Sequence, residues 1–481
     1  MSNSIAYLII ILYWLFFYKR VLFQPFYYAS SEALDCDFPT FHLCGEYWRR
    51  LKIPQDPYYF KYLIGSRTGT FYPLNIFFSW LSSFFGIDAA WRIYVFNIVL
   101  HGLLTTLFAY GLFSVYGNPL IALFGALAWG FAGYHIKFTL WWVQTFTWIT
   151  ATLWAFDAHH YTLCGISYGM LFLAGHPPLV LYFTYLFGGL CLVRGVFPLQ
   201  TFLTTFAIGG YQIYAYWKYA KVSVRQLYTT EDKVAKGKTP LWMYLFTFIP
   251  FAYKDFIDGV EYTDYAYYVT PLVVFFCFFG IGHSWLLLIP AIILSLGGRT
   301  FKFLGRFMSR YPCRWGYFAM LAILLIGVNG LYNLELNNIQ LVVIDVLLMI
   351  LLLPNMSLIP NYPFNQWSKK PSEYFETSLL KYLEEFAKGF RVNNLPYPVY
   401  SGQINHIETL GYTGGNHLIE NYYFLKLPKE GVAPYNWFDY NDDNVLVEKV
   451  RIKYHIGDRP SNNPKWEKVI GFDNLWKNNL L

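Results

Sequence analysis

Apolar runs separated by short polar turns fill the chain from its start to about residue 353. The first run, residues 5–23, is long enough to cross a bilayer as a helix. No small-residue cleavage motif follows it, so we expect a retained first span. Further runs bring the predicted number of spans to about eleven. They cover residues 91–116, 119–134, 138–156, 161–174, 178–193, 197–217, 265–279, 283–296, 315–331 and 339–353.

Polar segments interrupt this pattern at residues 24–73, 218–264 and 356–481. In the first of them, residues 41–52 predict an amphipathic helix at the membrane interface. Residues 74–85, which follow it, are apolar but too short to span. The last segment has the composition of a domain in water, with a helix expected at 372–389 and turn glycines between strand-length runs.

The expected fold is therefore mainly α: a polytopic membrane helical bundle in residues 1–355 and a small α+β domain in residues 356–481. An odd number of spans and an internal N-terminus would place all the long polar segments outside the cell. The excess of Lys and Arg in residues 218–264 contradicts the positive-inside rule in this orientation. We expect these cations to serve an anionic ligand, and the reversed orientation stays open.

Composition narrows the class of protein. Hydrophobic residues make up 56% of the 481 residues and charged residues only 14%, as is typical of membrane proteins. The net charge of +7 suits anionic lipid, and no basic stripe in a soluble module supports nucleic acid as a partner. The six cysteines show no CxxC spacing for zinc or redox chemistry. Cys36 and Cys44 either pair in an extracytoplasmic loop or stay free thiols.

Several short motifs follow one another in a fixed order between about residues 30 and 320. They are Leu51–Tyr58 with its Asp-Pro step, Gly69–Asn75 (GTFYPLN), Gly175-His176-Pro177, Gln212 with Ser223–Arg225 after it, Glu261-Tyr262, and Arg310–Arg314 before a span. In this order they resemble the GT-C glycosyltransferases, in particular the bacterial YfhO-like membrane proteins. One departure is Gln55, where that family has Trp.

The resemblance implies an inverting transfer of a sugar from a polyprenyl-phosphate carrier on the outer face of the membrane. The acceptor would be an extracytoplasmic glycan, lipid or cell-envelope polymer. The protein would be a multi-pass protein of the cell (inner) membrane, with its active site and its C-terminal domain outside the cytoplasm.

The acidic stretch Leu34–Pro39 opens the first polar segment and would supply the carboxylates that this chemistry needs. An acceptor hydroxyl is a poor nucleophile, and Asp35 or Asp37 would act as its base. Both face one side only if the stretch is extended, which Pro39 favours. The pair also suits a divalent metal, Mg²⁺ or Mn²⁺, with His42 nearby, so base and metal-ligand roles stay open. By itself the stretch equally fits a solvated loop with an N-cap aspartate.

Basic side chains would hold the phosphate of the lipid donor. Arg310 and Arg314 lie four residues apart before a span and suit bidentate phosphate binding, although ordinary interfacial snorkelling explains them equally well. Lys221 and Arg225 are weaker candidates for the same role. Glu261 either takes part in the site or forms a structural ion pair.

His176 lies at the proline-flanked hinge and is included among the substrate-binding residues. A structural histidine that caps a broken helix is the simpler interpretation of its position. Trp141-Trp142 and other aromatic pairs are more typical of a membrane belt or core than of a sugar platform. His159-His160 indicate a membrane interface.

Two other classes of protein fit the same pattern. A transporter or flippase of lipid-linked sugars also places charges in broken helices, but the chain shows no clear internal repeat. A non-catalytic envelope assembly protein would use its outer domain to bind a partner. Sugar transfer that depends on the acidic stretch separates both from an enzyme.

Overall fold

The computed structural model describes residues 1–23, 37–54, 69–133, 140–222, 241, 244, 247, 268–280, 284–296, 312–361, 370–388, 390–393, 408–409, 452–456 and 466–479. Asp35, Arg225, Glu261 and Arg310 lie outside these residues, and so does Cys36. The predictions made for them stay predictions.

The chain forms two compact units. The bundle unit consists of Met1–Ser30, Phe96–Tyr211 and Tyr228–Gln366, and the second unit consists of Ser31–Val95, Gln212–Leu227 and Trp367–Leu481. The first polar segment therefore shares a unit with the C-terminal residues. The predicted domain boundary at residues 355–356 stays a prediction.

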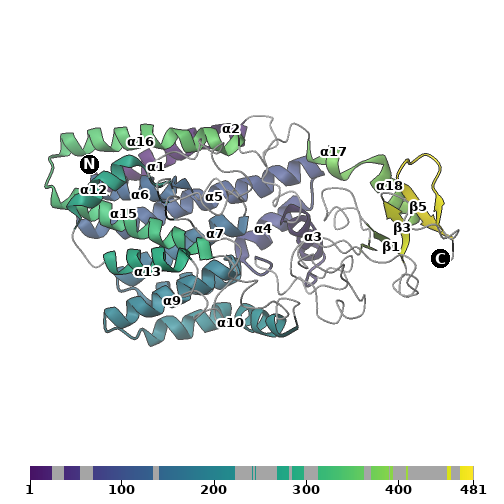
Figure 1. Cartoon of the computed structure of the whole chain (residues 1–481), viewed down its shortest axis with the longest axis horizontal. Coiled ribbons are helices and arrows are strands. Elements are labelled where there is room, and N and C mark those ends of the chain that lie inside the picture. Colours follow the sequence, from purple (N-terminus) through teal and green to yellow (C-terminus); the bar gives the residue numbers. More distant parts are fainter. Residues whose placement is uncertain are drawn as a thin grey trace. The chain divides into compact units, whose positions relative to one another are not determined.

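The described residues are mainly helical, as predicted, and the helices of the bundle unit run side by side (Figure 1). Each helix of this unit lies within or closely overlaps one of the predicted apolar runs. The helices are α1 (Asn3–Phe17), α2 (Lys19–Phe23), α5 (Ile87–Phe113), α6 (Pro119–Gly130), α7 (Leu140–Asp157), α8 (Tyr161–Ala174), α9 (Pro177–Val193), α10 (Leu199–Val222), α12 (Pro271–Phe276), α13 (Trp285–Ser295), α15 (Gly316–Asn333) and α16 (Asn338–Asn361). The first residues of α5 and the last residues of α10 belong to the second unit.

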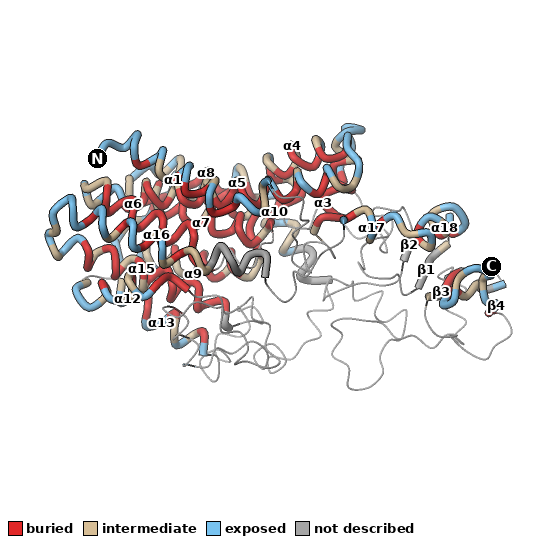
Figure 2. Tube along the Cα trace, turned by 90° about the horizontal axis from the view of Figure 1, so that it is seen from above, coloured by how far each residue is buried: buried red, intermediate tan, exposed pale blue. Residues whose placement is uncertain are grey.

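Helix α6 lies inside the bundle unit, where Figure 2 shows most of the buried residues. Every residue from Leu120 to Gly130 is buried, as expected for a helix that is apolar on all sides. It packs against α1, α15 and α16. The helix begins where the sequence predicts a turn: Asn118 caps it by accepting the Leu120 N–H at 2.9 Å, and Pro119 occupies the first turn.

Threonine hydroxyls join α5 to α7 inside the bundle unit. Thr105 and Thr147 are fully buried, and their hydroxyl oxygens lie 2.7 Å apart. The Thr147 hydroxyl also lies 3.0 Å from the carbonyl oxygen of His101, to which it can donate. Small polar side chains of this kind allow close helix packing and add hydrogen bonds between helices in an apolar environment.

The outer faces of the bundle unit are apolar. On α16, Val342, Val346 and Ile350 are 46–54% exposed, and Leu203 and Phe206 of α10 are more than 60% exposed. Contiguous exposed apolar faces are unfavourable in water and typical of helices in lipid. These faces support the prediction of a membrane protein.

Two helical stretches among the described residues, Ile87–Tyr116 and Gly316–Asn333, are long and apolar enough to cross a membrane by length and composition. Shorter apolar helices of 10–17 residues accompany them. The predicted total of about eleven spans stays a prediction.

In the second unit, α3 (Phe38–Arg49) packs against α4 (Pro73–Ser82). Helix α3 overlaps the amphipathic helix predicted at residues 41–52. Its first residue, Phe38, is fully buried, and its ring lies 4.9 Å from Trp91 and 5.9 Å from Phe375, measured between centroids. Aromatic packing thus joins α3 to the start of α5 and to the C-terminal residues.

The Gly69–Asn75 motif forms the start of α4. Gly69 has a φ of +86°, and the Asn75 side-chain amide donates to the Gly69 carbonyl at 3.2 Å. A Cβ at position 69 would lie 2.6 Å from the Asn75 amide nitrogen, so both the φ angle and the close contact require glycine. Pro73 then occupies the first turn of the helix. This motif closes a turn and begins a helix.

The C-terminal residues form two short helices and a mixed five-stranded sheet of order β2-β1-β3-β5-β4. The elements are α17 (Pro371–Phe375), α18 (Ser378–Phe386), β1 (Arg391–Asn393), β2 (Glu408–Thr409), β3 (Ile452–Ile456), β4 (Trp466–Lys468) and β5 (Leu475–Asn478). Strand β1 pairs in parallel with β2 and β3, whereas β5 pairs antiparallel with β3 and β4.

Helix α18 packs on this sheet through Leu380 and Leu383, which share a buried cluster with Tyr454 and Leu475. Burial in this cluster raises the pKa of the Tyr454 phenol. The prediction of a single helix at residues 372–389 is wrong, because two helices occupy this stretch. The hydroxyl of Thr377 accepts the Leu380 N–H at 3.2 Å and so begins α18 as a new helix.

Asp88, in the first turn of α5, holds the start of α17. Its carboxylate accepts the backbone N–H of Ser372 at 2.9 Å and the hydroxyl of the same residue at 3.0 Å. We expect Asp88→Ala to weaken this contact by about 1.5–3 kcal/mol, the usual value for hydrogen bonds to a charged group. Hydrogen exchange of α17 in the full-length protein measures the effect.

Ser372→Ala and the double variant complete a mutant cycle for this contact. The exposed Glu385→Ala in α18 is the control. Unchanged exchange of α17 in Asp88→Ala would contradict a role for Asp88 in positioning the C-terminal residues.

Candidate functional site

The amino ends of three helices of the bundle unit, α7, α9 and α15, lie close together. His176 is the N-cap residue of α9, Trp141 and Trp142 lie in the first turn of α7, and Arg314 lies in the short 3₁₀ helix η10 (Pro312–Trp315) that leads into α15. Side-chain contacts join all four residues. The amino ends of α7, α9 and α15 therefore converge.

The centre of this place is a pair of buried basic side chains. Nη1 of Arg314 lies 3.4 Å from Nε2 of His176, and each residue is only 7% exposed. The guanidinium group also lies over the Trp142 ring, 5.5 Å from its centroid. Two of the residues expected to bind the substrate phosphate thus meet, although 138 positions separate them in the chain.

The backbone around His176 is fixed by Thr145 of α7. The backbone N–H of His176 donates to the Thr145 hydroxyl oxygen at 2.6 Å, and that hydroxyl donates to the Trp141 carbonyl at 2.7 Å. The imidazole ring makes edge contacts with Trp141 and Trp142, at centroid distances of 5.0 and 5.3 Å. His176 is the N-cap residue of α9, but its side chain makes no capping hydrogen bond, and its ring reaches Arg314.

Aromatic stacking fixes the segment that carries Arg314. The Trp315 ring stacks on Tyr182 of α9 at 4.7 Å with an interplanar angle of 20°. The Tyr317 ring contacts Trp142 at 5.3 Å. Two aromatic residues that follow Arg314 are therefore held against α9 and α7, which limits the movement of the guanidinium group.

Electrostatics make this place suitable for an anion. The amino end of each helix carries roughly half a positive elementary charge. α7, α9 and α15 each contain 17 or 18 residues, so their backbone dipoles are well developed. A helix start beside a guanidinium group is a common arrangement for binding phosphate. At α9 the contribution is that of the dipole, because Pro177 and Pro178 have no N–H and the His176 N–H is bonded to Thr145.

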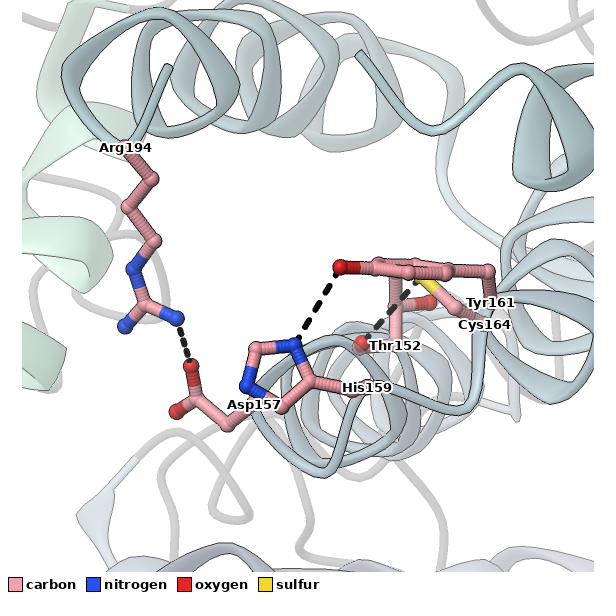
Figure 3. Close-up of polar contacts among 6 residues, drawn as sticks. All are labelled: Thr152, Asp157, His159, Tyr161, Cys164 and Arg194. Carbon is pink, nitrogen blue, oxygen red and sulfur yellow. Dashed lines mark hydrogen bonds and ion pairs between the residues drawn. The ribbon is translucent and has the colours of Figure 1, made fainter. Parts of the chain in front are cut away.

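A second polar group of residues occupies the opposite ends of α7 and α9 (Figure 3). Asp157, the last residue of α7, forms an ion pair with Arg194 at 2.5 Å just after the end of α9. His159, which has a φ of +58°, lies 3.2 Å from the Tyr161 hydroxyl. With 18 residues, α7 places these groups about 27 Å from the Arg314–His176 pair.

Asp37 lies at the start of α3 in the second unit and is partly buried. The expectation of an extended segment is wrong at this residue, because its φ of −75° and ψ of −50° are helical. Pro39 lies in the first turn of α3, where proline favours a helix start. His42 is buried one turn further on. The catalytic or metal-binding role of Asp37 stays a prediction.

The remaining predictions are not tested by the described residues. Lys221 lies near the end of α10. No group of three or more His, Cys, Asp or Glu side chains among the described residues is arranged to hold a metal ion. Because Asp35 lies outside those residues, the Mg²⁺ or Mn²⁺ prediction stays a prediction.

Sequence reasoning missed Trp142 and Thr145 as parts of this site. Trp141-Trp142 were assigned to a belt or core, and their burial does not distinguish that role from a place beside Arg314. One signal was available: the proline after His176 indicates the start of a helix, and helix starts attract anions. Nothing in the sequence pairs this start with the start of α7.

Comparisons with known proteins give little further information. No protein-family model matches the chain, and no curated protein matches it. Among solved structures, the apo crystal structure of the Archaeoglobus fulgidus oligosaccharyltransferase is similar, with a TM-score of 0.46 and 12% sequence identity. The match covers 95% of this chain and 69% of that chain. An identity and a TM-score this low transfer no activity to this chain.

Gly175 sets the position of His176, and its replacement tests the hinge. A Cβ at Gly175 would lie 2.5 Å from the Leu171 carbonyl oxygen and 2.6 Å from a Val180 methyl carbon. We expect Gly175→Ala to destabilise the protein by about 1–3 kcal/mol, as overpacking usually does. Thermal unfolding in detergent measures this loss.

Gly189→Ala is the matched control for this variant. No atom lies within 4 Å of a Cβ at Gly189, and alanine is the better helix former. If both alanine variants unfold at the same temperature as the parent protein, the backbone at Gly175 does not constrain the histidine.

Proposed function

We propose that the chain is a membrane glycosyltransferase of the GT-C type that transfers a sugar from a polyprenyl-phosphate donor to an extracytoplasmic acceptor. The observation that carries this proposal is the buried Arg314–His176 pair at the converging starts of α7, α9 and α15. A lipid-linked donor presents a phosphate group, and this arrangement suits a phosphate. The ordered motifs that resemble the YfhO-like proteins add independent support.

The surroundings of the pair suit a lipid-linked donor better than a water-soluble one. Apolar side chains are exposed on the outer faces of α10 and α16, which favours a lipid environment around the bundle unit. The length of α7, about 27 Å, is close to the thickness of a bilayer core. We propose that the protein is a multi-pass protein of the cell (inner) membrane.

In the proposed reaction, the acceptor oxygen attacks the anomeric carbon of the sugar, and the bond from that carbon to the phosphate oxygen breaks. The electron pair of that bond leaves with the lipid phosphate, whose charge grows in the transition state. The Arg314 guanidinium would stabilise this charge, and His176 would position the guanidinium and donate to a phosphate oxygen. Attack from the opposite face inverts the anomeric configuration.

The acceptor hydroxyl must lose its proton as it attacks. We propose Asp37 or Asp35 as the base that takes this proton. Mg²⁺ or Mn²⁺ bound by the two aspartates is part of the proposal, and we assign no step to it. Lys221, Arg225 and Arg310 are proposed to add positive charge near the phosphate.

Arg314→Gln tests the phosphate role. We expect transfer from a polyprenyl-phosphate donor to fall about 100- to 1000-fold, as when one transition-state donor is lost from an enzyme. Arg314→Lys keeps the charge but loses the bidentate geometry, so we expect an intermediate rate. Initial rates with purified protein in lipid nanodiscs measure both variants.

Arg194→Gln is the matched control, because this arginine forms its ion pair at the opposite end of α9 and is 42% exposed. Loss of such a pair costs only about 0–1 kcal/mol of stability. Transfer that is undiminished in a folded Arg314→Gln variant would rule out the proposed phosphate site.

Asp37→Ala tests the proposed base. We expect sugar transfer to be abolished at normal expression, while binding of the lipid-phosphate donor is retained, because the base acts on the acceptor. Transfer and donor binding are measured on the same preparation, with Glu385→Ala as the surface control. Full activity in the Asp35→Ala/Asp37→Ala double variant would eliminate both carboxylates from the mechanism.

A further inference from the structure

Helix α16 carries one charged residue, Asp345, in an otherwise apolar segment. Asp345 is 4% exposed and lies on the same helix face as Leu341, Leu348 and Leu352, which are 0–2% exposed. Val343 and Leu347, on the opposite face, are 61% and 42% exposed. The carboxyl group therefore points into the bundle unit.

Both carboxyl oxygens of Asp345 are fully buried and have no hydrogen-bond partner among the residues that the structure describes. A buried carboxylate without a partner costs several kcal/mol or more, which is a large part of the stability of a protein. Such a group either is neutral because it has bound a proton, or is charged and binds a cation.

Two described helices beside Asp345, α6 and α1, offer no charge to compensate it. Helix α6, which packs against α16, contains no titratable residue, and α1 contains only the tyrosines Tyr7 and Tyr13. The Tyr13 hydroxyl donates to the Met349 carbonyl at 2.8 Å, and the Tyr268 hydroxyl donates to the Leu351 carbonyl at 2.8 Å. Both hydroxyl protons are thus used by backbone groups further along α16.

The side chains near Asp345 favour a proton over a metal ion as its ligand. A metal ion in a protein takes several oxygen, nitrogen or sulfur ligands, and no group of three or more His, Cys, Asp or Glu side chains exists among the described residues. A proton needs only one carboxyl oxygen. A bound proton removes the charge, and with it most of the cost of burial.

We propose that Asp345 is a proton-binding site inside the helical bundle. This goes beyond the proposed sugar transfer, whose chemistry uses no carboxyl group on α16. Asp345 lies seven residues after the first residue of the helix, about 10 Å along its axis from the polar start at Asn337 and Gln340. Carboxyl groups that gain and lose a proton within apolar helices are typical of proton-linked membrane proteins.

A hydrophobic carbodiimide tests this proposal on the full-length protein in detergent. The O–H of a carboxylic acid adds across a C=N bond of the reagent, so only the protonated form reacts, and the adduct keeps the whole mass of the reagent. We expect peptide mass spectrometry to find the adduct at Asp345, with a yield that falls as the pH rises. Asp345→Asn should lose the adduct.

Two other aspartates serve as controls within the same sample. Asp157 is ion-paired with Arg194, and Asp88 accepts two hydrogen bonds from Ser372, so the carboxyl groups of both are already engaged and we expect no adduct at either. Absence of the adduct at Asp345 throughout the pH range in which the protein is folded would overturn the proposal. Equal labelling of Asp157 would overturn it as well.

A stability measurement gives an independent test that does not depend on reagent access. Asp345→Val replaces the carboxyl group by an apolar one close to it in volume and removes the cost of burying it. We expect its unfolding temperature to equal or exceed that of the parent protein, with loss of the protonated-carboxyl band in the infrared spectrum. A lower unfolding temperature would show stabilising contacts of the carboxyl group and would contradict a proton site. Neither outcome depends on sugar transfer.

Discussion

Helix α6 must be covered on every side, and the bundle unit follows from this constraint. A helix without a polar face cannot lie at a water surface, and in lipid it gains more from close packing with other helices than from lipid contacts. Helices α1, α15 and α16 supply that packing. The position of α15 then sets where Arg314 enters, and the position of α16 turns Asp345 inward.

The basic residues at the ends of α9 agree with the helix dipole, whereas Asp157 at the carboxyl end of α7 is compensated by its ion pair with Arg194. Arg314 and His176 lie at the amino ends of α7, α9 and α15, where an anion is favoured. The carboxyl end of α9 is followed by Arg194, a cation at the end where cations are favoured. The guanidinium group and the helix starts together favour an anion, which is why we assign the phosphate to this end.

Side-chain caps and prolines explain several of the helix starts among the described residues. Asn118-Pro119 begins α6, and Pro177 begins α9 after the tight contact at Gly175. Such signals can be read from the sequence, because a proline in the first turn and a side-chain cap act within a few residues. The same rules apply at Thr377, whose side chain caps α18 and divides the predicted single helix into two. They also apply at Asp37, because Pro39 lies in the first turn of α3 and the backbone there is helical, not extended.

The sequence by itself determined the mainly helical fold and the apolar runs that became α5 to α16, because hydrophobic periodicity and helix caps are local properties. It also indicated Arg314 and His176 as separate candidates, Arg314 with an equally good structural explanation and His176 with a structural explanation that was simpler. Only the tertiary structure decided that the two side chains meet beside Trp142 and that Asp345 faces inward. Contacts between residues 138 positions apart depend on how helices pack, and no pattern within a single helix specifies that packing.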